Sequence, residues 1–106
     1  MLVRLALWSL ADSDVTIEEL RSELQDSIDA FVDVPGLLFA TWISDHATER
    51  WGSIEVWVSR EASESQLPSQ ARELIGKDPE LVEVFDVEAT VSIAEELTRL
   101  GLALGN

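Results

Sequence analysis

Short apolar runs separated by polar turns recur along the chain and predict four strands. The first run, residues 2–10, ends in a polar stretch around Asp12 and Asp14, and its length and flanks are typical of a buried strand. Pro35-Gly36 precedes the next run, and the turn Asp-His-Ala-Thr-Glu separates the second strand from the third. The predicted strands are residues 2–10, 37–44, 50–59 and 81–87.

Between and after these strands, apolar residues recur at steps of three and four, which predicts helices. Ser13, Asp14 or Thr16 can cap the first helix, and Thr16 with Glu19 fits a capping box, in which a hydroxyl and a carboxylate each bind a free backbone N–H. A second helix is predicted over residues 60–75, although Pro68 fits only if the helix begins a few residues before it. A last helix is predicted from the apolar stripe Ile93, Leu97, Leu100 and Leu104.

The order of these elements indicates the fold class. It is βαββαβ with a C-terminal helix, in a single domain over residues 1–106, which is the ferredoxin-like split βαβ pattern of the α+β class. Trp51 and Trp57 share one face of the third strand, and Ile54 and Val56 share the other, so both faces are apolar. Two helices cover one face of such a sheet, and a second copy is the simplest cover for the other. We therefore predict a homodimer.

The charge of the chain narrows its possible partners. Of the 106 residues 21 are acidic and seven are basic, and the net charge of −14 disfavours nucleic acid and anionic membrane surfaces. The chain has no cysteine, which excludes disulfides, thiolate metal sites and cysteine nucleophiles. No apolar run is long enough to span a membrane, and the N-terminus lacks the pattern of a signal peptide. We expect a cytoplasmic protein with neither nucleic-acid nor membrane partners.

Several short strings of the chain together resemble a known family. The matching residues are Pro35-Gly36-Leu37-Leu38, Trp42, Trp51-Gly52, Ile54 and Val84-Phe85-Asp86-Val87. In these residues the chain resembles the YdhR-like monooxygenases of the dimeric α+β barrel superfamily, which also contains the antibiotic-biosynthesis monooxygenases. The resemblance implies a homodimer whose two sheets face each other, with a pocket between each sheet and its own helices. It also implies oxidation of a planar aromatic or polyketide-like small molecule by O₂, without a metal, a flavin or another cofactor.

The tryptophans are the first candidates for a binding site. Trp8, Trp42 and Trp57 could wall a flat pocket and stack on a planar aromatic ligand. The alternative is that they fill the core or the dimer interface, where tryptophan is common. Trp51 fits that alternative best, because it stands at the start of a strand.

Three further residues are candidates for catalysis. Arg4 and Glu55 are charges inside strands that should be adjacent, with Glu55 as a general base for a phenolic proton and Arg4 stabilising the oxyanion. The alternative is a buried ion pair that fixes strand register. His46, the only histidine, is a third candidate base in the turn before the third strand, or else a solvated turn residue. Its spacing from Asp45 and Glu49 matches no known metal site, so we predict none.

Several functions therefore compete. The first is a cofactor-independent monooxygenase acting on a planar aromatic compound. The second is a non-catalytic dimer that binds or senses a small hydrophobic ligand, and others are a cyclase or isomerase on the same fold, or a purely structural dimer. A hydrolase triad is not supported, because no serine or threonine stands in a suggestive relation to the histidine.

Overall fold

The computed structural model of the protein describes residues 1–91. Within this range the chain forms four strands, two α-helices and two 3₁₀-helices. In chain order they are β1 (Leu2–Ser9), α1 (Ile17–Ser27), η1 (Ile28–Asp33), β2 (Leu37–Asp45), β3 (Arg50–Trp57), η2 (Ala62–Glu64), α2 (Ala71–Ile75) and β4 (Leu81–Asp86). The predicted C-terminal helix lies outside the described residues.

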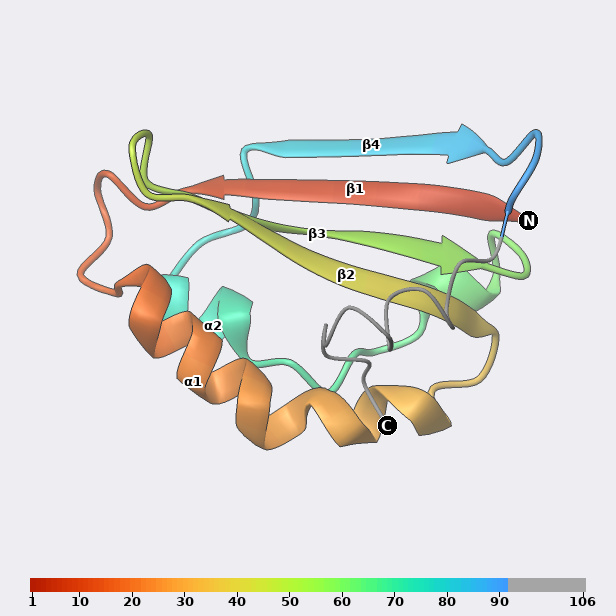
Figure 1. Ribbon diagram of the computed structural model, residues 1–106, viewed down its shortest axis with the longest axis horizontal. Helices are drawn as coiled ribbons and strands as arrows, with labels where there is room; N and C mark the ends of the chain where they lie inside the picture. The colour runs from red at the N-terminus through yellow and green to blue at the C-terminus, as the bar shows by residue number, and fades with distance from the viewer. Residues whose placement is uncertain (92–106) are drawn as a thin grey trace.

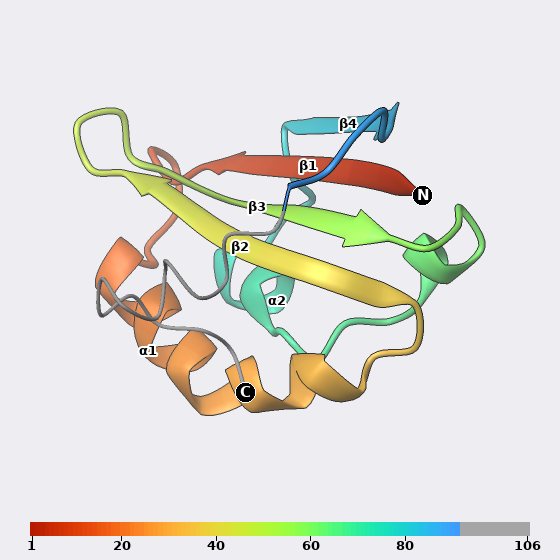
Figure 2. The same ribbon diagram turned by 45° about the vertical axis from the view of Figure 1, so that its right-hand side comes forward.

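The strands form one antiparallel sheet in the order β2-β3-β1-β4. Helices α1 and α2 lie on the same side of this sheet, as two views show (Figures 1 and 2). Among residues 1–91, no helix lies on the other side, which we call the open face. The predicted α+β ferredoxin-like fold is therefore confirmed. No helix within residues 1–91 is long and apolar enough to cross a membrane.

Helix α1 begins at the predicted cap Thr16, whose hydroxyl binds a backbone N–H as in a capping box, whereas the Glu19 carboxylate binds that hydroxyl. The backbone N–H of Glu19 donates to Thr16 Oγ1 at 3.1 Å, and the Thr16 hydroxyl donates to Glu19 Oε1 at 3.2 Å. Ile17 and Leu20 on this helix are buried against the sheet. The α-helix ends at Ser27 and the chain continues as η1, which carries the buried Phe31.

The predicted second helix is wrong in its length. Instead of one helix over residues 60–75, the structure has the single turn η2 and the short helix α2, with Pro68 between them. Proline lacks the N–H that a helix interior requires and disfavours helical geometry in the residue before it. Helix α2 ends at Gly76, whose φ of 89° is the left-handed conformation typical of a helix end.

The side of the sheet that faces α1 and α2 holds the core. The buried cluster joins a strand, the first helix and the second through Leu10, Val15, Ile17, Leu20, Trp51, Ala71 and Ile75. Side chains alternate along a strand, so Ser53, Glu55 and Trp57 share the helix-covered face with Trp51. Alternation had predicted this grouping, and the structure shows which of the two apolar faces the helices cover.

Candidate functional site

Arg4 on β1 and Glu55 on β3 are directly opposite each other in the sheet. Their side chains meet on the helix-covered face, where Arg4 Nη1 lies 3.6 Å from Glu55 Oε1. The Glu55 side chain is 4 % exposed and the Arg4 side chain 30 %. The predicted meeting of the two residues is confirmed. The Glu55 carboxylate is almost completely shielded from water, whereas the Arg4 guanidinium is partly exposed to solvent.

Two neighbours on the same strand hold the Glu55 carboxylate. The Ser53 hydroxyl donates to Glu55 Oε2 at 3.0 Å, and the Trp57 indole N–H donates to Glu55 Oε1 at 3.1 Å. These residues stand two positions before and after Glu55, so the pleat of β3 presents all three on one face. Sequence reasoning missed Ser53 as part of the site. Its position two residues before Glu55, on the same face of the predicted strand, could have identified it.

The tryptophans all lie on the helix-covered face, but in different surroundings. Trp57 is fully buried and Trp51 is 5 % exposed within the core cluster. Trp8 and Trp42 are only partly buried. The Trp8 indole N–H donates to the Lys77 carbonyl at 2.9 Å. Of the three predicted ligand-stacking residues, Trp8 and Trp42 thus keep exposed surface, whereas Trp57 has none left for stacking on a ligand.

Trp42 lies on the edge strand β2, which is the neighbour of β3 in the sheet. It is paired in register with Ser53, and Ala40 is paired with Glu55. The Phe31 ring of η1 packs edge-on against Trp42, with centroids 4.8 Å apart and planes at 81°. This T-shaped contact is a favoured geometry for aromatic pairs and fixes the orientation of the Trp42 indole.

The structure places His46 away from these residues. His46 lies in the turn after β2 and its Nε2 is 3.1 Å from Glu18 Oε1 at the start of α1, where both side chains are exposed. Glu55 lies five residues along β3 from Arg50 at the end of the hairpin, about 16 Å at a rise of about 3.3 Å per residue. A backbone hydrogen bond at Glu18, followed by the His46 ring, lowers the pKa of the Glu18 carboxyl. The catalytic role of His46 stays a prediction.

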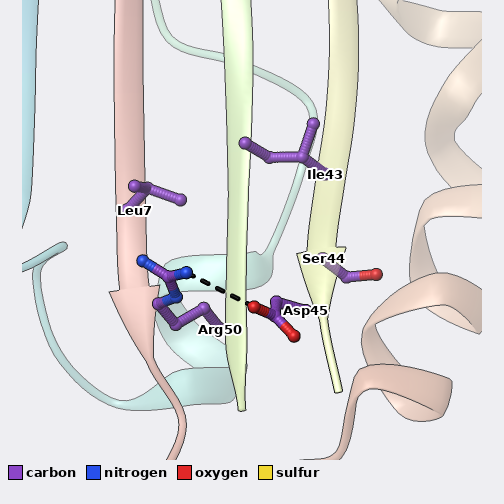
Figure 3. Close-up of a pocket in the computed structure, with 5 residues that line it drawn as sticks. All are labelled: Leu7, Ile43, Ser44, Asp45 and Arg50. Atoms are coloured by element: carbon purple, nitrogen blue, oxygen red, sulfur yellow. Dashed lines mark hydrogen bonds and ion pairs between the residues drawn. The ribbon is translucent and has the colours of Figure 1, made fainter. Parts of the chain in front are cut away.

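A hollow of about 220 Å³ lies on the open face, at the hairpin end of β2 and β3. Figure 3 shows its lining, which is Leu7, Ile43, Ser44, Asp45 and Arg50. Arg50 Nη2 lies 3.3 Å from Asp45 Oδ2 across its floor. The Thr48 hydroxyl, and then Arg50, lower the pKa of the Asp45 carboxyl. This hollow is on the side of the sheet opposite to Arg4 and Glu55.

The residues around Glu55 together offer three kinds of contact to a small molecule. A desolvated carboxylate can accept a proton or a hydrogen bond from a ligand hydroxyl. A partly exposed guanidinium can stabilise an oxyanion, and indole rings supply flat apolar walls. Among residues 1–91, no group of three or more acidic or histidine side chains is arranged to hold a metal ion.

Comparison with solved structures identifies proteins of the same fold. A protein from Chloroflexus aurantiacus J-10-fl, provisionally named an antibiotic biosynthesis monooxygenase, has a TM-score of 0.62 and 16% identity, over 88% of this chain and 98% of that chain. SnoaB, a cofactor-independent oxygenase from Streptomyces nogalater, has a TM-score of 0.60 and 16% identity, over 85% of this chain and 95% of that chain. This chain has the fold of these oxygenases.

A further protein with the same provisional name, from Deinococcus radiodurans, has a TM-score of 0.59 and 16% identity, over 88% of this chain and 98% of that chain. No protein-family model matches the chain, and no match was found among curated proteins. Identities this low establish the fold alone. The narrower YdhR-like grouping stays an expectation from sequence.

Proposed function

We propose that the protein is a cofactor-independent monooxygenase that oxidises a planar aromatic small molecule with O₂ at the Arg4–Glu55 site. The observation that carries the proposal is the buried Glu55 carboxylate, held by Ser53 and Trp57 and facing the guanidinium of Arg4. The fold shared with SnoaB, whose name describes it as a cofactor-independent oxygenase, supports the same activity.

The chemistry follows from the three kinds of contact at the site. Glu55 accepts the acidic proton of a phenol or its keto tautomer, and the resulting carbanion or phenolate is rich enough in electrons to react with O₂. Arg4 stabilises the negative charge on the substrate oxygen. A reacting methylene carbon loses its two hydrogens and gains one oxygen atom, and the second oxygen atom leaves as water. Trp8 and Trp42 hold the ring system flat while this occurs.

Oxygen uptake by wild-type protein and a Glu55→Gln variant tests the proposal. The amide keeps the size and an acceptor oxygen of the side chain but cannot take the proton. We expect uptake with an anthrone or a related planar phenol to fall by about a hundredfold or more in the variant, because general-base catalysis contributes about 10²–10⁴-fold. Unchanged turnover in the variant contradicts the assignment of Glu55 as the base.

The second candidate is a dimer that binds a small hydrophobic ligand without turning it over. The observation that favours it is that Ser53 and Trp57 donate hydrogen bonds to Glu55 and Arg4 pairs with it, which holds the carboxylate in a fixed position as a hydrogen-bond acceptor. Saturable binding of planar phenols by a protein that never consumes oxygen would establish this function instead.

We further propose that two copies pair through their open faces. Large apolar side chains remain exposed there, among them Phe39 at 50 % and Phe85 at 54 %. Four strands spaced about 4.8 Å apart, most of them eight or nine residues long at about 3.3 Å per residue, make a face of about 500 Å² in projection. A mainly apolar patch of this size is at the upper end of what monomers expose.

Paired variants of β4 test the dimer. Phe85→Glu places a charge on the open face, whereas Val82→Glu places the same charge on the opposite face of the same strand, at a residue 46 % exposed. We expect light scattering to give a dimer for the wild type and Val82→Glu, and a monomer for Phe85→Glu. A monomeric wild type at micromolar concentration contradicts the pairing.

A further inference from the structure

The Glu55 carboxylate offers its two oxygens to different neighbours. Oε1 accepts a hydrogen bond from the Trp57 indole at 3.1 Å and also forms an ion pair with the Arg4 guanidinium, whose Nη1 lies 3.6 Å away. Oε2 faces one donor among the described residues, the Ser53 hydroxyl at 3.0 Å. A carboxylate has about four lone-pair positions, two on each oxygen. Each oxygen thus accepts one of these hydrogen bonds, but Oε1 is also engaged in the ion pair, so Oε2 is the oxygen that we assign to a ligand hydroxyl.

The register of the sheet shows which side of the site Oε2 approaches. Ser53 is paired with Trp42 on β2 and with Ala6 on β1, so the hydrogen bond from Ser53 draws Oε2 toward the row of the sheet that contains Trp42. Trp42 is partly buried and keeps surface for stacking, and Ala6 projects only a methyl group. A planar ligand that stacks on the Trp42 indole would therefore place its own hydroxyl group near Glu55 Oε2.

We infer that Ser53 is a positioning residue, which holds Glu55 Oε2 in place as the acceptor for the ligand hydroxyl. Ser53 and Glu55 are 7 % and 3 % exposed, so water does not compete for their hydrogen bond. Without the Ser53 hydroxyl, the carboxylate is held only through Oε1, and the carboxylate group can rotate so that Oε2 leaves its position. This inference rests on the proposed function, because it assumes a planar hydroxyl-bearing ligand at the Trp42 side.

The test compares two probes that differ by one hydroxyl group, 2-naphthol and naphthalene. The ratio of their affinities measures the hydrogen bond to Glu55, and naphthalene alone measures the apolar pocket. In Ser53→Ala we expect the preference for naphthol to fall by about tenfold, because hydrogen bonds to charged groups are among the stronger ones. Naphthalene should bind as in the wild type.

Two further variants separate positioning from general damage. Ser53→Thr keeps the hydroxyl on a residue that strands favour, and should keep the preference for naphthol. Thr41→Val removes a hydroxyl from the open face, where Thr41 is paired with Ile54, and should change neither affinity. A preference for naphthol that survives in Ser53→Ala overturns the inference and leaves the proposed function intact.

A measurement without ligand decides the same question independently. The Trp57 indole N–H donates to the other oxygen of the carboxylate, so its NMR resonance reports the orientation of Glu55. We expect the resonance to shift in Ser53→Ala and to return in Ser53→Thr. An unshifted resonance in Ser53→Ala overturns the positioning role. If neither probe binds the wild type, the proposed function fails, and the resonance still decides whether Ser53 orients Glu55.

Discussion

Replacing Arg4 by methionine should expose how strongly the buried carboxylate depends on its cation. Methionine keeps an unbranched stem for packing and removes the charge. Two unit charges 3.6 Å apart interact by about 4.6 kcal/mol at an effective dielectric constant of about 20. Arg4 is 30 % exposed, so solvent screens part of this interaction, and we expect the free energy of unfolding to fall by about 2–3 kcal/mol.

The matched background for this variant is Glu55→Gln, because the amide keeps an acceptor for the Trp57 indole and loses the charge. In that background Arg4→Met should cost only about 1 kcal/mol, through lost packing of the arginine stem. The coupling between the two sites is then about 1–2 kcal/mol. Urea unfolding followed by tryptophan fluorescence, at one protein concentration, measures all four proteins. An equal cost of Arg4→Met in both backgrounds would refute the reasoning.

Three other predictions concern the frame that carries the site. The Lys77 ammonium is the main cause that lowers the pKa of Glu80; such a group stabilises the fold above its unfolded pKa of about 4.3 and loses this effect as pH falls through the lower folded value. The thermal stability of the wild type should therefore exceed that of Glu80→Gln at about pH 6, and the difference should shrink as pH falls through the lowered pKa; a difference that does not change with pH contradicts the assignment. Gly52→Ala should lower the free energy of unfolding by about 2 kcal/mol or more, because the added Cβ meets the Ala6 carbonyl oxygen; a neutral result in urea unfolding would show that β1 and β3 can separate there. Thr16→Ala should cost about 1 kcal/mol by the same assay, because a helix N-cap is lost, and no loss would mean that the capping box adds nothing.

The main features of the site could be predicted from sequence because they follow from strand periodicity and topology. Alternation along β3 groups Ser53, Glu55 and Trp57 on one face. The split βαβ order makes β1 and β3 antiparallel neighbours, which brings Arg4 opposite Glu55. Neither step needs knowledge of side-chain rotamers, and both predictions are confirmed.

The rest depends on side-chain orientation and long-range packing, which periodicity does not contain. Alternation places Ser53 on the same face as Glu55 but does not reveal that its hydroxyl turns to the carboxylate. The contact between His46 and Glu18 joins a turn to a helix 28 positions away in the sequence. Apolar spacing alone predicts one helix over residues 60–75, whereas Pro68 limits the helical structure there to η2 and the short α2.

The most direct test of the central claim is a tryptophan-fluorescence titration of the wild-type protein with planar phenols, quinones and anthrones. Trp42 is paired with Ser53, next to Glu55 on the same face, and is only partly buried, so we expect a planar ligand at this site to contact its indole. The account predicts saturable quenching at micromolar ligand that weakens in Arg4→Met. The absence of quenching across the whole panel would contradict it and leave the tryptophans as packing residues.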